Sequence, residues 1–238
     1  MAQQLYFEVH GTGEPLLLLH GFSGSSQDWT PSPVQWGTEF QLILPDLRGH
    51  GRSGILSKPF RHEDAASDML ALLDHLGIRT CKGVGISAGG NVLLHMATKQ
   101  PERITAMVLV SATPYFPAQA RAIMSQYADN LSEEQSEVLR RRHSGGEEQI
   151  KAILASTKSF AITYDDLNFT PPLLSTIQAR TFIIQGDRDP LYPVELSVEL
   201  FKSIPNSRLR IVPNSGHGPV IGARWQEFLQ AASTFLQD

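Results

Sequence analysis

The chain has 238 residues and a formal net charge of −4, from 24 acidic and 20 basic residues. Hydrophobic residues make up 41% and charged residues 18% of the chain, as in an ordinary soluble globular protein. This composition excludes a large basic field that would bind nucleic acid or an anionic membrane, so the expected partner is an uncharged small molecule.

The sequence carries no signal for export or membrane attachment. Residues 1–10 lack the basic segment that opens a secretory signal, and no apolar run approaches the roughly 18 residues of a membrane span. Cys81 is the only cysteine, so neither an internal disulfide nor a cysteine-based metal site is expected. These features predict a cytoplasmic protein.

Short apolar runs bounded by Gly, Pro or Asp alternate with helical patterns and predict a doubly wound α/β sheet. Several runs are apolar enough to be buried on both faces, as in a parallel sheet. The predicted strands are Leu5–Val9, Pro15–Leu19, Gln41–Leu44, Cys81–Ile86, Ala106–Val110, Thr181–Ile184 and Arg208–Val212. The predicted helices between them are His62–Leu76, Gly90–Lys99, Pro193–Lys202 and Ala223–Leu236.

The alternation breaks between Pro114 and Ile177, where Gln, Glu, Arg and Ala dominate. Prolines at both junctions suit the ends of an insertion, because proline stops helices and stiffens connections. We expect residues 1–113 and 178–238 to form the core and residues 114–177 to form an inserted helical cap. An ordinary helical excursion with no role at the site is the alternative. The helices predicted in the cap are Ala118–Ala128, Ser132–Arg142 and Glu147–Lys158, without a convincing strand.

Ser87 is the candidate nucleophile. It lies in Gly85-Ile86-Ser87-Ala88-Gly89, between a predicted strand and a predicted helix. A serine hydroxyl is a weak nucleophile unless a sharp turn presents it to a base, and the two glycines remove side chains that would collide around such a turn. The following helix adds a dipole that favours negative charge near Ser87.

Further motifs accompany this turn. Leu17-Leu18-Leu19-His20-Gly21-Phe22 follows the second predicted strand, and Asp28-Trp29 and Asp46-Leu47-Arg48-Gly49-His50-Gly51-Arg52-Ser53 come after it. Together with the serine turn they resemble the α/β-hydrolase family, in particular its small, cap-bearing esterase and lactonase branch. The resemblance implies a mostly parallel sheet flanked by helices. Longer members begin with an extra strand, whereas only residues 1–4 precede Leu5 here, so seven strands are expected.

The resemblance also implies an oxyanion hole. In the family two backbone N–H groups hold the oxygen that becomes negative, and the matching positions are Phe22 and Ala88. We expect His20, which precedes the oxyanion glycine, to hold the loop by hydrogen bonds rather than to act as a base.

The fold family places an acid and then a histidine after the serine. Of the eight histidines only His217 follows Asp189, and it lies in a flexible turn just past a predicted strand. His217 is therefore the candidate base. The acid has two candidates in Gly186-Asp187-Arg188-Asp189-Pro190. The family pattern selects Asp189, which leaves Asp187 as a turn-former or a partner for a nearby cation.

Neither a cofactor nor a metal ion is expected. The sequence contains no phosphate-binding Gly-x-x-x-x-Gly-Lys-Ser/Thr pattern, no dinucleotide fingerprint and no cluster of His, Cys and Asp at metal-ligand spacing.

The combined features predict a carboxylesterase-like serine hydrolase that cleaves esters or lactones of small, uncharged substrates with water through an acyl-enzyme on Ser87. Other chemistry on the same residues remains an alternative, such as C–C bond hydrolysis, perhydrolysis or a lyase reaction. A small-molecule receptor with a hydrolase-like pocket is a further one. Apolar cap residues are expected to roof the pocket, and the candidate substrate-binding residues are Phe22, Tyr115, Phe116, Met124 and Tyr127.

Overall fold

A computed structural model describes residues 5–30 and 32–238, so the expectations for residues 1–4 lie outside it. Within this range the chain forms a seven-stranded sheet in the order β1-β3-β2-β4-β5-β6-β7. β1 is antiparallel to β3 and all other neighbours are parallel. The prediction of a mostly parallel, seven-stranded sheet is confirmed. The strands are β1 (Phe7–His10), β2 (Glu14–Leu19), β3 (Phe40–Pro45), β4 (Cys81–Ile86), β5 (Ile104–Val110), β6 (Arg180–Gly186) and β7 (Ser207–Val212).

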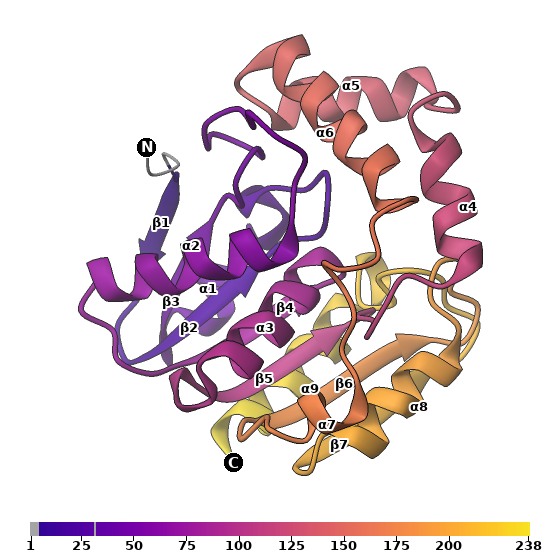
Figure 1. Ribbon diagram of the computed structural model, residues 1–238. Coiled ribbons are helices and arrows are strands. Elements are labelled where there is room, and N and C mark those ends of the chain that lie inside the picture. Colours follow the sequence, from indigo (N-terminus) through magenta and orange to yellow (C-terminus); the bar gives the residue numbers. More distant parts are fainter. Residues whose placement is uncertain (1–4, 31) are drawn as a thin grey trace.

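Helices cover both faces of the sheet (Figure 1). Alternate strand residues point to opposite faces, so Leu17 and Leu19 of β2 pack in one core cluster and Leu16 and Leu18 in the other. One face carries α2 (His62–His75), α3 (Ala88–Lys99) and α8 (Val194–Ser203), and the other carries α1 (Ser32–Trp36) and α9 (Trp225–Gln237). No helix in the described part of the chain is long and apolar enough to span a membrane.

Two short helices were not expected from the sequence, namely α1 and α7 (Pro171–Leu174). Each has only one turn, which is too short for a periodic apolar pattern to register. In α7 the two prolines that read as helix breakers occupy the first helical positions, where the missing N–H and the fixed φ are tolerated.

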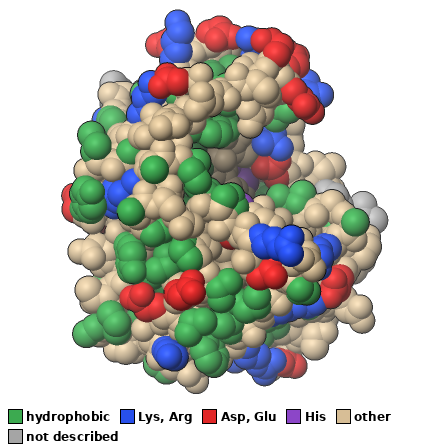
Figure 2. Space-filling view, turned by 90° about the vertical axis from the view of Figure 1, so that its right-hand side faces the viewer, with side chains coloured by type: hydrophobic (Ala, Val, Ile, Leu, Met, Phe, Trp, Pro, Cys, Tyr) green, Lys and Arg blue, Asp and Glu red, His purple; other side chains and the backbone are tan. Residues whose placement is uncertain are grey.

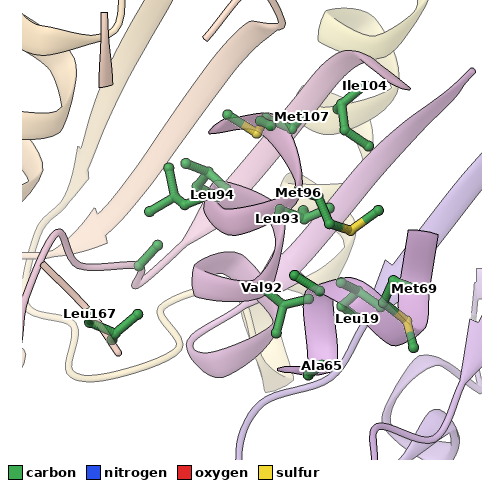
Figure 3. Close-up of a cluster of buried hydrophobic side chains, with 14 of the residues drawn as sticks. Leu19, Ala65, Met69, Val92, Leu93, Leu94, Met96, Ile104, Met107 and Leu167 are labelled. Atoms are coloured by element: carbon green, nitrogen blue, oxygen red, sulfur yellow. The ribbon is translucent and has the colours of Figure 1, made fainter. Parts of the chain in front are cut away.

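Helix α3 is held firmly in the core, and it begins directly after Ser87. Figure 3 shows Val92 and Leu93 of α3 among buried side chains from the sheet and from α2. These neighbours include Leu19 of β2, Met69 of α2 and Met107 of β5, all fully buried. The helix therefore fixes the position of the turn that carries Ser87.

Residues 114–177 lie between β5 and β6 and contain α4 (Ala118–Tyr127), α5 (Glu133–Arg142), α6 (Gly146–Phe160) and α7. In Figure 1 helices α4 to α6 extend beyond the carboxyl ends of the central strands. Over the described residues this insertion contributes no strand to the sheet, and its one isolated bridge joins Tyr115 to Asn168.

The insertion is fastened to the core by a buried amide. The Gln149 side chain on α6 is fully buried and its Nε2 donates to the carbonyl oxygens of Gly49, Gly51 and Ser53 at 3.1–3.2 Å. The Gly51 N–H in turn donates to His143 Nδ1 at 2.9 Å. The loop after β3 therefore anchors α6 and the end of α5.

Candidate active site

Ser87 lies at the sharp turn between β4 and α3, with φ of +53°, a conformation that non-glycine residues rarely adopt. The turn is packed against its surroundings. A Cβ added to Gly85 would lie 2.4 Å from the Gly89 carbonyl carbon, and one added to Gly89 would lie 2.3 Å from the Leu19 carbonyl oxygen. The glycines on both sides of Ser87 are therefore sterically required, as the sequence motif predicts.

The structure brings Ser87, His217 and Asp189 together in one hydrogen-bond chain. His217 Nδ1 lies 2.8 Å from Asp189 Oδ2, and His217 Nε2 lies 2.8 Å from Ser87 Oγ. An ionised carboxylate only accepts hydrogen bonds, so Nδ1 carries the proton and Nε2 accepts from the serine hydroxyl. This protonation pattern is the one that a general base requires.

Asp189 is buried, with 7% of its surface exposed, and its carboxylate is saturated with donors. Besides His217, Gln185 Nε2 donates to Oδ2 at 2.9 Å, and the Leu191 and Tyr192 N–H groups donate to Oδ1 at 2.8 and 3.0 Å. Burial alone would raise the pKa of Asp189, but the hydrogen bonds from His217 and from the Tyr192 and Leu191 N–H groups outweigh it and lower the pKa below its ordinary value. The group is therefore held as an anion.

Asp187, the other candidate acid, accepts from the Ser215 N–H at 3.0 Å, whereas His217 Nδ1 is bonded to Asp189. This backbone hydrogen bond is the main cause that lowers the pKa of Asp187, which is otherwise exposed. Asp187 therefore stabilises the turn that leads into His217, in line with its interpretation as a turn-former.

Sequence reasoning missed two further contacts that hold the His217 loop. The Gly218 N–H donates to Ser111 Oγ at 3.1 Å, and Ser111 is a fully buried residue with φ of +51° at the end of β5. A Cβ on Gly186 would lie 2.3 Å from the Ser215 carbonyl oxygen, so the loop also packs tightly on the end of β6. A serine after a strand is too common a feature to reveal this contact in the sequence.

The two candidate oxyanion donors flank Ser87. Ala88 is the first residue of α3, where a backbone N–H has no intrahelical acceptor. The loop of Phe22 approaches from β2, since a Cβ on Gly21 would be 3.7 Å from the Ser87 Cβ. Within the described residues no protein acceptor takes the Phe22 N–H.

His20 holds this loop by hydrogen bonds. The ring is fully buried, its Nδ1–H donates to the Gly21 carbonyl at 2.7 Å, and its Nε2 accepts from the Leu47 N–H at 3.0 Å. Burial lowers the pKa of His20, which favours the neutral ring that these two hydrogen bonds need.

A cavity of about 500 Å³ opens beside Ser87 and His217 under the insertion. Figure 2 shows the hollow between the insertion at the top and the core below, with a histidine visible at its base. Four of the five predicted substrate-binding residues line it, namely Phe22, Phe116, Met124 and Tyr127. Tyr115, the fifth, lies elsewhere. It pairs with Asn168, its side chain is 39% exposed, and it lines neither this cavity nor the next.

A second cavity of about 520 Å³ lies on the other side of Ser87 and is more polar. Arg142 from α5 and Asp28 from the 3₁₀ turn Ser26–Trp29 face it and form an ion pair of 2.6 Å. Arg142 also belongs to a run of three arginines, and nothing in the sequence indicates which of them turns inward. Sequence reasoning therefore missed this pair.

Across residues 5–30 and 32–238 no group of three or more His, Cys, Asp and Glu side chains has the arrangement of a metal site. Cys81 is buried at the start of β4, and burial raises the pKa of its thiol to about 12. It is not poised to act as a thiolate.

Comparison with known proteins agrees with this architecture. The family model of the alpha/beta hydrolase fold matches residues 14–147, and the chain belongs to that family. Pimeloyl-[acyl-carrier protein] methyl ester esterase of Nitrosomonas europaea is 26% identical, over 91% of this chain and 94% of its own. A non-heme haloperoxidase of Rhodococcus erythropolis is 25% identical, over 90% and 89%. The structure of a thermophilic esterase from Thermogutta terrifontis has a TM-score of 0.80 at 24% identity and covers 99% of this chain and 93% of its own.

The environment of Asp189 predicts an acid-dependent contribution to stability. A carboxyl group whose folded pKa lies below its unfolded value of about 3.9 stabilises the fold above about pH 4, and this stabilisation is lost as pH falls through the folded pKa. The difference in free energy of unfolding between the wild type and Asp189→Asn should therefore shrink between about pH 5 and pH 3. Urea unfolding measures it. Ser87→Ala removes no titrating group in this range and is the control; a pH-independent difference for Asp189→Asn would contradict the prediction.

Proposed function

We propose that the protein is a serine hydrolase that cleaves carboxylic esters or lactones of small, mainly uncharged substrates. The observation that carries the proposal is the hydrogen-bond chain from Ser87 Oγ through His217 to Asp189, with both distances at 2.8 Å. A relative that is named as a methyl ester esterase supports a reaction at a carboxylic ester.

In the first half of the reaction, Ser87 Oγ attacks the substrate carbonyl carbon and its proton passes to His217 Nε2. Asp189 keeps the imidazole in the required tautomer and stabilises the imidazolium. The carbonyl oxygen becomes negative and is held by the Phe22 and Ala88 N–H groups, where loss of one such donor typically costs about 3 kcal/mol. The C–O bond then breaks, and the alcohol leaves with the proton from His217.

In the second half, water takes the place of the alcohol. His217 removes a proton from the water as its oxygen attacks the acyl carbon, and the proton is then given back to Ser87 Oγ as the acid leaves. The fully buried anchors of the His217 loop, among them Ser111, keep the imidazole in place through both halves.

The two cavities suggest where the two parts of an ester lie. The cavity under α4 and α6 is mainly apolar and would take the acyl group, while the cavity with Arg142 and Asp28 would take the alcohol. Residues 114–177 would then act as a cap that selects the acyl group. Ser87 and His217 line both cavities, so the scissile bond would lie where the two meet.

Perhydrolysis is the second candidate, and the similarity to a non-heme haloperoxidase favours it. Hydrogen peroxide would replace water in the attack on the acyl-enzyme, and a peracid would leave instead of an acid. The same residues would carry both reactions, so product analysis with and without peroxide distinguishes them.

The first test asks whether Ser87 is the nucleophile. We expect an organophosphonate probe to label Ser87 alone, as mapped by mass spectrometry, and Ser87→Ala to lower kcat for an aryl ester by about 10³ or more. Labelling at another residue, or undiminished turnover by Ser87→Ala, would refute the assignment. If the wild type binds esters without turning them over, the protein is a receptor.

The second test uses the two neighbouring aspartates as a matched pair. Asp189→Asn should lower kcat by about 10⁴, because the imidazole loses its charged partner and adopts the wrong tautomer. Asp187→Asn removes a carboxylate only two residues away and should retain most of the activity, since Asp187 contacts the backbone of the loop and not the ring. Steady-state kinetics measure both, and the reverse ranking would falsify the assignment of the acid.

The third test concerns the cap. Met124 is 8% exposed and lines the apolar cavity, so Met124→Trp should shorten the space for the acyl chain. We expect kcat/KM to fall about tenfold or more for hexanoate and longer esters and to change little for acetate. The control is Gln126→Trp, at an exposed position of the same helix. An equal loss at every chain length would show that Met124 affects catalysis or stability in general.

A further inference from the structure

A second buried His–Asp pair lies at the apolar cavity. His62 is the first residue of α2, is 1% exposed, and lines the same cavity as Ser87 and Met124. Its partner Asp166 comes from the returning segment of the insertion, more than 100 residues further along the chain, and is 3% exposed. The proposed reaction at Ser87 does not use either residue.

Asp166 binds the start of α2 through several donors. Its Oδ2 accepts from the His62 backbone N–H at 2.9 Å and from His62 Nδ1 at 2.7 Å, and its Oδ1 accepts from the Glu63 N–H at 3.2 Å. Burial alone would raise the pKa of Asp166, but the hydrogen bonds from the His62 side chain and from the His62 and Glu63 N–H groups hold it far below its ordinary value. The carboxylate is therefore an anion at a helix N-terminus.

The anion fixes the tautomer of His62. A carboxylate cannot donate, so Nδ1 of His62 carries a proton, and in the neutral form of the ring Nε2 is the acceptor. Within the described residues no side chain or backbone group is hydrogen-bonded to Nε2, and Nε2 is not among the fully buried atoms that lack a partner, so it is accessible from the cavity. A purely structural role, in which Asp166 fastens the insertion to α2, explains the hydrogen bonds of His62 Nδ1 and of the backbone. It does not explain Nε2.

The surroundings of the ring are aromatic. His62 packs against Phe60, Phe116 and Phe160 with ring centroids 5.2, 5.8 and 5.3 Å apart, and Phe116 and Phe160 line the cavity too. These contacts hold the imidazole plane in place. An acceptor atom held in an apolar wall favours a ligand that supplies a donor at that point, because an apolar ligand group there would bury Nε2 without a partner.

We infer that His62 Nε2 accepts a hydrogen bond from a hydroxyl group on the acyl part of the substrate. The enzyme then favours esters of hydroxy acids over esters of plain alkanoic acids of the same length. This inference rests on the proposed ester hydrolysis at Ser87 and on the placement of the acyl group in the apolar cavity. Asp166 acts as a positioning residue, since it sets the tautomer without touching the substrate.

The test compares methyl hexanoate with its singly hydroxylated derivatives. In the wild type at least one hydroxylated ester should have the higher kcat/KM. In His62→Phe, whose ring suits the aromatic surroundings, the ratio of kcat/KM for the hydroxylated ester to kcat/KM for the plain ester should fall about tenfold. A ratio that does not change would overturn the inference.

The matched control is His95→Phe. His95 Nε2 donates to the Asp166 backbone carbonyl at 2.7 Å, so this variant also removes a hydrogen bond to the segment of Asp166, but His95 does not line the cavity. We expect the ratio of the two esters to stay at its wild-type value. A similar fall in both variants would mean that the Asp166 segment acts through the fold and that Nε2 does not select the acyl group.

A measurement on the wild type covers the case in which His62→Phe fails to fold. In protein with ¹⁵N-labelled histidine, nitrogen shifts should show His62 protonated at Nδ1 and bare at Nε2. The unreactive hydroxyhexanamide that matches the preferred ester should shift the Nε2 signal and hexanamide should not. A protonated Nε2, or equal shifts with both amides, would refute the inference. The nitrogen shifts do not depend on turnover. Failure of the inference about His62 can therefore be distinguished from failure of the proposed hydrolysis, which would appear as no turnover of any ester.

Discussion

The left-handed backbone of Ser87 is the constraint on which the rest of the site depends. A serine at φ of +53° is strained and persists only where its surroundings over-determine it. Here the glycines at 85 and 89 allow contacts that any Cβ would block, and α3 is locked in the core by fully buried residues such as Leu93. This backbone conformation points Oγ toward His217. Packing of the core therefore stabilises the strained turn that presents the hydroxyl group.

Strand order explains how distant residues converge on that hydroxyl. β4, β5, β6 and β7 are parallel neighbours, so their carboxyl ends lie side by side, and Ser87, Ser111, Asp189 and His217 follow them in that order. Ser87 contributes a hydroxyl group, Ser111 supports the His217 loop, Asp189 contributes a carboxylate and His217 contributes an imidazole. The two carboxylates after β6 hold different parts of the His217 loop. Asp187 binds the loop backbone at Ser215, and Asp189 binds the ring of His217.

The sequence could predict the sheet and the turn that carries Ser87 from local patterns, whereas the choice of His217 and Asp189 depended on the resemblance to the family. Apolar runs and the glycines around Ser87 are readable without knowing the fold, and all seven strands formed within a few residues of their predicted ends. The residues that line the cavity were harder to predict from the sequence. Tyr115 and Phe116 are adjacent and aromatic, yet only Phe116 points inward, since the direction depends on the bridge from Tyr115 to Asn168. The pairs Arg142–Asp28 and His62–Asp166 could not be predicted, because the partners in each pair lie more than 100 residues apart in the chain.

Contacts with the core hold one wall of the apolar cavity in place, namely α6 and the segment around Asp166. Gln149 is tied to the loop after β3 and Asp166 to the start of α2, so α6 and the returning segment are fixed at two separate places on the core. Helix α4 packs mainly on α6, and it carries Met124 and the half-exposed Ile123 at the cavity. Buried polar ties resist displacement more than a flexible apolar contact does, because breaking them leaves unpaired groups. In the proposed reaction the fixed wall would hold His62 Nε2 at a constant distance from Ser87, and the flexible side chain of Met124 in the opposite wall would accommodate acyl chains of different length.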